Sequence, residues 1–289
     1  DKYVNTSELD KILREEISAL LLENPHSQTK NIDETKKPYV IMVVGVNGVG
    51  KTTTAHAIGA WLQIKQNKKV LFLDLDQQGN LTYSTGASNS DYNTLEVLVA
   101  GRLQADKAQL TSSGFSVIPS TPSLANVDAV LNQTGKEYRL KEALADLDSF
   151  DFVVMDTPPS LNIITINALT ASDYAVIPAQ ADIFSLQGIT QLGQTIEAVK
   201  RYTNKNLKVL GIVLTKHNTR SILSRDLQQV ITDTAIQLHT KVYTQHIREA
   251  VAVREAQAMK QDVFSYDPKS NATQDYDALM KEIWKDINQ

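Results

Sequence analysis

The sequence contains no cysteine, which excludes disulfide bonds, thiol chemistry and cysteine-based zinc sites. Its five histidines lie far apart, without the spacing of metal ligands. No apolar run approaches the roughly 20 residues that span a bilayer, and no signal peptide is visible. We therefore expect a cytoplasmic protein with no membrane partner, and we expect Asp1 to be a trimmed start.

The 289 residues are enough for one large α/β domain or two small ones. Residues 5–24 predict a helix with Ser7 as its N-cap and one apolar stripe. Residues 25–38 are polar, with proline at both ends, which is typical of a linker. We therefore divide the chain into an N-terminal helix and linker, residues 1–38, and a main domain, residues 39–289.

From residue 39 onward, short apolar runs alternate with amphipathic stretches. The apolar runs cover residues 39–44, 70–75, 115–119, 152–156, 174–178 and 209–215. Helix-like stretches lie between them, for example at 184–202 and 221–238. This alternation predicts a doubly wound α/β fold, in which helices cover both faces of a mainly parallel sheet.

The glycine-rich segment from Gly45 to Thr52, GVNGVGKT, matches the phosphate-loop pattern G-x-x-x-x-G-K-[ST]. It follows a predicted strand and precedes a predicted helix, as the pattern requires. Lys51 would reach the β- and γ-phosphates, and the Thr52 hydroxyl would bind Mg²⁺. The alternative is a glycine-rich turn without a ligand. The predicted nucleotide-binding residues of this segment are Gly45, Asn47, Gly48, Val49, Gly50, Lys51, Thr52 and Thr53.

Three aspartates follow apolar runs. Asp156 ends FVVMD, where it would hold Mg²⁺ through water or, alternatively, cap the next turn. Asp74 and Asp76 end a second run, and the two-residue period of a strand places both on one side. One could orient the attacking water and the other support the metal shell, unless both are solvated turn residues.

From about residue 52 to its end, the chain resembles the ParA/Soj-type partition ATPases of the deviant-Walker (SIMIBI) class. The resemblance is carried by KTTTAHAIGAWL, VLFLDLDQQGN, DFVVMDTPPSL, YAVIPAQADIFSLQGI, VLTKHNTRS and FSYDPKSNATQDYDALMKEI. It implies an ATPase that needs ATP and Mg²⁺, forms an ATP-dependent homodimer and binds non-specific DNA on the nucleoid. It also implies a ParB-like centromere-binding partner, with Lys51 and Asp76 as catalytic residues and Asp156 as the Walker-B carboxylate.

The opening stretch departs from this pattern. ParA proteins read K-G-G-V-G-K-T-T, whereas Val46 stands here at the place of the signature lysine, which reaches across the dimer. Residues 1–54 instead resemble the signal-recognition-particle receptor family, FtsY, from the end of its N domain into its phosphate loop. We interpret the chain as a hybrid of the two families, joined near GVGKTTT. The join is natural or engineered, and the abrupt switch favours engineering. The missing signature lysine predicts impaired hydrolysis.

The hybrid interpretation raises the choice between ATP and GTP. A guanine-reading motif would be T-K-x-D, but Thr215 and Lys216 are followed by His217 and Asn218. The neutral amide of Asn218 lacks the charge that an aspartate offers to guanine, so we expect ATP, with Asn218 near the base.

Basic residues gather late in the chain. Residues 195–260 contain eleven lysines and arginines against five acids, although the whole chain has a net charge of −4. A local basic surface indicates phosphate-backbone binding, and solvated helix faces are the alternative. The predicted DNA-binding residues are Lys216, Arg220, Arg225, Arg254 and Lys260.

The last helix-like stretch places Tyr276, Leu279, Met280, Ile283 and Ile287 on one face. Its charges are balanced, which favours docking on the core over lipid binding. Three functions remain open: a DNA-partition ATPase, a targeting GTPase of the signal-recognition-particle receptor type, and a hybrid that binds nucleotide with little turnover.

Overall fold

The computed structural model describes residues 37–217 and 222–289, with the side chains of this part except those of 222–225. Its strands form a 7-stranded sheet in the order β3-β4-β2-β5-β1-β6-β7. The strands are β1 (Tyr39–Val43), β2 (Val70–Asp74), β3 (Gln109–Leu110), β4 (Ser116–Ile118), β5 (Phe152–Asp156), β6 (Tyr174–Ala179) and β7 (Lys208–Leu214). Six of them lie where the apolar runs predicted strands.

The central strands are apolar on both sides because both faces of the sheet are covered. β1, β2, β5 and β6 are buried throughout, and β1 pairs in parallel with β5 and with β6. The doubly wound, mainly parallel fold is therefore confirmed. β3 was not predicted; it is a two-residue antiparallel edge strand, too short to carry an apolar run.

Helices connect the strands and form the two outer layers. The α-helices are α2 (Lys51–Gln66), α3 (Asn80–Thr85), α4 (Thr94–Ala100), α5 (Val127–Val130), α6 (Arg139–Leu144), α7 (Ile163–Ala171), α8 (Ile183–Tyr202), α9 (Ile222–Gln237), α10 (Val251–Ala258), α11 (Val263–Tyr266) and α12 (Asn271–Ile287). Short 3₁₀ helices are η2 (Ala105–Lys107), η3 (Pro122–Asn126) and η4 (Lys136–Tyr138). α8 and α9 begin and end within one residue of their predicted bounds.

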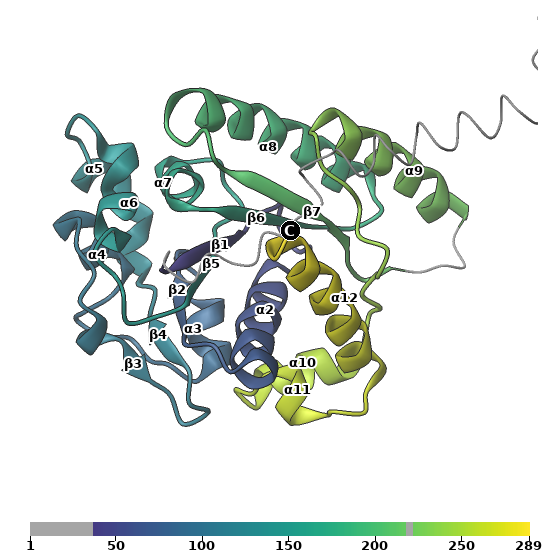
Figure 1. Cartoon of the computed structure of the whole chain (residues 1–289), viewed down its shortest axis with the longest axis horizontal. Helices are drawn as coiled ribbons and strands as arrows, with labels where there is room; N and C mark the ends of the chain where they lie inside the picture. Colours follow the sequence, from purple (N-terminus) through teal and green to yellow (C-terminus); the bar gives the residue numbers. More distant parts are fainter. Residues whose placement is uncertain (1–36, 218–221) are drawn as a thin grey trace, which may run out of the picture.

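The two faces of the sheet support separate apolar cores. Successive residues of β1, such as Ile41 and Met42, point into opposite cores, as the two-residue period of a strand requires. One core lies beneath α4 to α9, and the other beneath α2, α3 and α10 to α12 (Figure 1). Because all but β3 run in the same direction, the phosphate loop and the predicted aspartates meet at one edge of the sheet.

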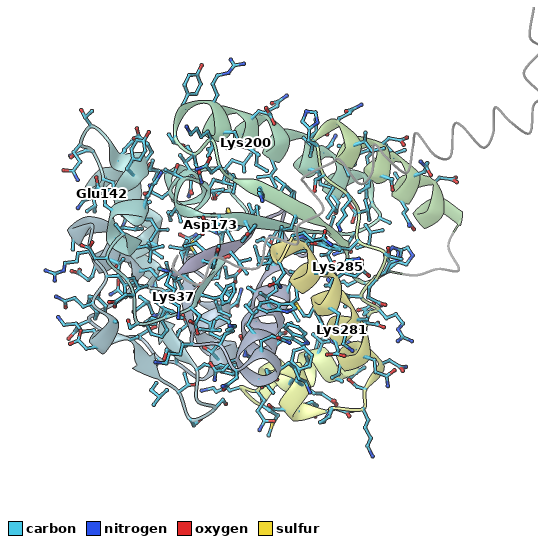
Figure 2. The ribbon with its side chains drawn as sticks, viewed as in Figure 1. Lys37, Glu142, Asp173, Lys200, Lys281 and Lys285 are labelled. Carbon is cyan, nitrogen blue, oxygen red and sulfur yellow. The ribbon has the colours of Figure 1, made fainter. Side chains whose placement is uncertain are left out.

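α12 packs on the core, as its amphipathic pattern predicted. Tyr276, Leu279 and Met280 are buried, whereas Lys281 and Lys285 lie on its outer side (Figure 2). Within residues 37–217 and 222–289, no helix is long and apolar enough to cross a membrane.

The helix predicted for residues 5–24 lies outside the described residues, as does most of the linker. β1 begins at Tyr39, the first residue assigned to the main domain. The division into two parts nevertheless stays a prediction.

Candidate nucleotide site

The segment between β1 and α2 adopts a conformation that its glycines permit. Gly48 and Gly50 have φ angles of 77° and 83°, in the left-handed region that side chains rarely enter. A Cβ added at Gly45 would lie 2.8 Å from the Pro178 carbonyl oxygen. The backbone therefore turns tightly from the sheet into the helix, and larger residues at these three positions would displace it.

The carbonyl groups of this loop are held by side chains of the surrounding elements. Lys51 Nζ donates to the Val46 carbonyl at 2.8 Å, and Gln180 Nε2 donates to that of Gly48 at 2.9 Å. Thr215 Oγ1 donates to the Val49 carbonyl at 2.7 Å. Among the described residues, no backbone N–H from Asn47 to Gly50 donates to the chain. Donors without an internal partner make the loop suited to an anion.

Lys51 lies at the start of α2 and is buried. Burial lowers the pKa of its ammonium group, and the negative charges of Asp156 and Asp76 oppose that shift. A cation held beside the loop in a partly dehydrated site interacts strongly with phosphate oxygens. The phosphate role of Lys51 stays a prediction.

Thr52 and Asp156 meet across the edge of the sheet. Thr52 Oγ1 donates to Asp156 Oδ2 at 2.5 Å, while Asp156 Oδ1 is buried without a hydrogen-bond partner among the described residues. Burial, together with the nearby charge of Asp74, raises the pKa of Asp156 to about 8. A cation would favour the ionised carboxylate, and an oxygen-rich pair with a free acceptor fits hydrated Mg²⁺.

Asp74 is the register partner of Asp156 on the neighbouring strand but has different contacts. Its Oδ2 accepts bonds from the Thr82 N–H and hydroxyl, both at 2.7 Å, and its Oδ1 accepts the Asp76 N–H at 3.1 Å. Burial raises the pKa of Asp74 to about 6. Both oxygens are thus engaged within the chain, and support of the metal shell by Asp74 stays a prediction.

Asp76 lines the cleft beside the loop and is nearly buried. Its Oδ1 accepts the Gln78 N–H at 3.0 Å, and its own carbonyl accepts the Ser120 hydroxyl at 2.5 Å. No described residue donates to Oδ2, which leaves one oxygen for a water molecule. The backbone around Asp76 is therefore fixed while half of its carboxylate remains available.

The phosphate loop, Lys51, Thr52 and Asp76 line a cleft of about 540 Å³. One wall carries residues that the sequence prediction included: Asn47, Gly48, Gly50, Lys51, Thr52, Thr53 and Asp76. The opposite walls were missed, and they comprise Asn80, Tyr83 and Ser84 of α3, residues 247–250, and Val253, Gln257 and Ala258 of α10. Gln257 Nε2 donates to Thr53 Oγ1 at 2.9 Å, which ties α10 to the first turn of α2. The segment after β7 could have been suspected, because ligands gather beyond the carboxyl ends of parallel strands.

Those of the predicted DNA-binding residues whose side chains are described lie at the cleft or beside it. Lys216 and Arg254 line the cleft, and the Lys260 ammonium lies 5.1 Å from the ring centre of Tyr83, another cleft residue. Arg225 belongs to α9, but its side chain lies outside the described set, as do Arg220 and Asn218 entirely. The DNA-binding role of all five cations stays a prediction.

Val46 packs against α8. A Cβ added at Gly188 would lie 1.7 Å from Val46 Cγ1, so the glycine leaves the space that the valine fills. The side chain at this loop position is therefore apolar and partly buried rather than a cation over the cleft.

The parallel sheet, the glycine-rich loop and the Thr52–Asp156 pair define a P-loop nucleoside triphosphatase. Residues 40–209 match the model of a family described as an AAA domain. The chain is 37% identical to the chromosome partitioning protein ParA of Caulobacter vibrioides, over 82% of this chain and 90% of that protein. It is also 37% identical to the sporulation initiation inhibitor protein Soj of Bacillus subtilis, over 82% of this chain and 94% of that protein. The chain belongs to the ParA/Soj family of partition ATPases.

A solved relative has the same architecture. The structure of cobyrinic acid a,c-diamide synthase from Mycobacterium smegmatis, with bound ADP and magnesium, has a TM-score of 0.68 to this chain. It is 32% identical, over 81% of this chain and 97% of that one. The identities to ParA and Soj confirm the predicted resemblance to that family, whereas the FtsY-like segment and the hybrid interpretation stay predictions. In the solved relative, the same fold holds a magnesium nucleotide.

Proposed function

We propose that this chain is a Mg²⁺-dependent ATPase of DNA partition. The observation that carries the proposal is the phosphate loop, whose N–H groups have no acceptor among the described residues, placed beside Lys51 and the Thr52–Asp156 pair. Family membership supports the partition role. The finer parts of the proposal are an ATP-dependent homodimer, non-specific DNA binding on the nucleoid, and a ParB-like partner that stimulates hydrolysis.

In the proposed reaction, a water molecule attacks the γ-phosphorus of ATP, the bond to the β–γ bridging oxygen breaks, and ADP and phosphate leave. Asp76 would hold the water through its available oxygen, and Lys51 would bind the phosphate oxygens. Thr52 and Asp156 would hold Mg²⁺, which when bound neutralises charge on the β- and γ-phosphates. Water that is already oriented needs little reorganisation to reach the transition state.

ATP rather than GTP is the proposed nucleotide because Asn218 lacks the charge of a guanine-reading aspartate. Competition calorimetry with the Mg²⁺ complexes of both nucleotides tests this choice. We expect ATP to bind more tightly. Tighter binding of GTP would instead favour the targeting GTPase suggested by residues 1–54.

A second candidate is a hybrid that binds nucleotide with little turnover, and Val46 is the observation that favours it. FtsY-like residues 1–54 joined to a ParA-like body would explain a valine where the family has its signature lysine. Valine brings no charge to a partner's phosphates, whereas a cation at a phosphoryl transition state is worth about 10³-fold or more in rate.

The double variant Val46→Lys with Asn47→Gly tests this candidate. Single-turnover ATP hydrolysis, with and without DNA, should rise well above the parent rate, while ATP affinity stays similar because the loop backbone and Lys51 are retained. Val46 fills the space at Gly188, so thermal unfolding of the variant serves as the folding control. An unchanged rate and unchanged dimerisation would show that this loop does not limit turnover.

A further inference from the structure

The lysine after β7 is attached to the phosphate loop. Lys216 Nζ donates to the Gly48 carbonyl at 2.9 Å, and Lys216 lines the same cleft as Lys51 and Thr52. The Gly48 carbonyl also accepts Gln180 Nε2, so two side chains from β7 and β6 strand ends converge on one loop atom. Lys216 therefore has a specific partner at the loop, unlike a cation on a solvated helix face.

The backbone of Lys216 is held in an uncommon conformation. Its φ angle is 49°, which is left-handed and unfavourable for a residue with a side chain. The flanking residues are fixed: the Thr215 N–H donates to the Ala179 carbonyl at 2.8 Å, and the His217 N–H donates to that of Ile247 at 3.0 Å. Such outliers persist only where the surroundings enforce them, and they gather at binding sites.

The contact with Gly48 also affects the loop's donors. The Gly48 carbonyl and the Val49 N–H belong to one peptide unit, so a cation at the oxygen polarises the unit and strengthens the N–H as a donor. That N–H is among those without an internal acceptor in the described part of the chain. The Lys216 charge thus favours anion binding by the loop, on which Val46 places no charge.

We propose that Lys216 is a positioning residue of the nucleotide site. It holds the phosphate loop in its anion-binding form through Gly48, and it carries positive charge on the cleft wall formed with residues 247–250. This inference rests on the proposed nucleotide-binding function. It assigns Lys216 to the nucleotide rather than to DNA.

The test compares Lys216→Met with the matched control Lys205→Met. Lys205 is an exposed lysine before β7, at the opposite edge of the sheet from the cleft. Calorimetry with Mg·ATP and with Mg·ADP should show about tenfold weaker binding of both nucleotides to Lys216→Met, because a charged hydrogen bond to the loop is lost. Lys216→Arg should recover most of the affinity, and Lys205→Met should match the parent.

Affinity for a mixed-sequence DNA duplex is measured on the same proteins. Loss of nucleotide affinity with unchanged DNA affinity and unchanged unfolding temperature without nucleotide supports the proposal. Unchanged nucleotide affinity of Lys216→Met overturns it. If nucleotide affinity is unchanged and DNA affinity falls, Lys216 belongs to a DNA-binding surface instead. Nucleotide binding by the parent is the separate test of the proposed function: if the parent binds neither ATP nor GTP, that function fails before any variant is compared.

Discussion

Asp74 and Asp156 occupy equivalent places at the ends of neighbouring strands, yet they are held differently. Both are fully buried, and they are register partners in the sheet. Asp74 accepts three hydrogen bonds from the chain, whereas Asp156 accepts one from Thr52 and keeps Oδ1 unpartnered within the described residues. The same pattern of an apolar strand ending in aspartate thus produces one carboxylate with both oxygens bonded within the chain and one with an oxygen left unpartnered among the described residues.

The cause of the difference lies in the segments that follow the strands. After β2 the chain turns into α3, and Thr82 in that helix brings two donors back to Asp74. After β5 the chain continues as TPPS, and Asp156 faces the first turn of α2 instead. A buried acceptor without a donor costs free energy, and such a cost is retained where a ligand supplies the missing partner.

Asp76 is the third carboxylate at this edge, and its removal should have the largest effect on activity. Asp76→Ala should lose at least about 10²-fold in hydrolysis rate, because water orientation and proton transfer contribute that much or more. ATP affinity and unfolding temperature should stay near the parent values, since within the described residues the Asp76 carboxylate accepts a bond only from the Gln78 N–H of its own turn, and the backbone bonds of Asp76 are kept. Single-turnover hydrolysis measures the rate; turnover at the parent rate would move the water-holding role to another residue.

Asp74→Ala should be the most destabilising of these carboxylate changes. It leaves the Thr82 and Asp76 N–H groups buried without their acceptor, which we expect to cost about 3 kcal/mol in the free energy of unfolding. Denaturant unfolding without nucleotide measures that loss. If the variant kept the parent stability but lost Mg²⁺-dependent binding, Asp74 would belong to the metal shell and the comparison with Asp156 would fail.

Asp156→Asn should raise the free energy of unfolding, whereas Asp74→Ala should lower it. The folded protein holds this carboxyl at a pKa of about 8, whereas the unfolded chain ionises near 3.8. A raised pKa of this kind favours folding below about 3.8, and that advantage is lost as the pH rises toward 8. An uncharged amide removes the loss, which amounts to about 4 kcal/mol at pH 7, but it leaves an N–H group without an acceptor at the Oδ1 position. The variant without nucleotide should therefore be more stable at pH 7, on the order of 2 kcal/mol.

The same variant should lose function. Mg²⁺ should no longer strengthen ATP binding, because the amide offers no negative charge to the cation. Unfolding measured from pH 4 to pH 8 should show the difference between variant and parent growing with pH. A difference that stayed constant or shrank would show that Asp156 is ionised in the folded protein without nucleotide.

The sequence predicted the fold and one wall of the cleft because those features are local. An apolar run ending in aspartate can be recognised from consecutive residues, and so can the glycines that allow left-handed φ angles. Other contacts around the cleft join residues far apart in the sequence: Ser120 is 44 residues from Asp76, and Gln257 is 204 residues from Thr53. Residues 247–250 carry no motif, so only the folded chain places them at the cleft.

Lys216 illustrates the same limit. Its charge suggested DNA, because composition counts cations without showing where they point. Its contact with Gly48 joins residues 168 positions apart and depends on a left-handed backbone at Lys216. The sequence predicts neither feature.

The smallest effect should come from Thr82→Val, which removes one hydrogen bond to Asp74 and leaves the carboxylate itself in place. Valine keeps the shape and the N–H bond to Asp74 but loses the hydroxyl, which also accepts the Ser120 N–H at 2.9 Å. We expect a cost of about 1 kcal/mol in unfolding free energy. ATP affinity should be unchanged, because among the described residues the hydroxyl bonds only to Asp74 and to the Ser120 N–H. A clear fall in Mg²⁺-dependent affinity at unchanged stability would mean that Thr82 keeps Asp74 oriented for the metal, and that the two strand ends share one role after all.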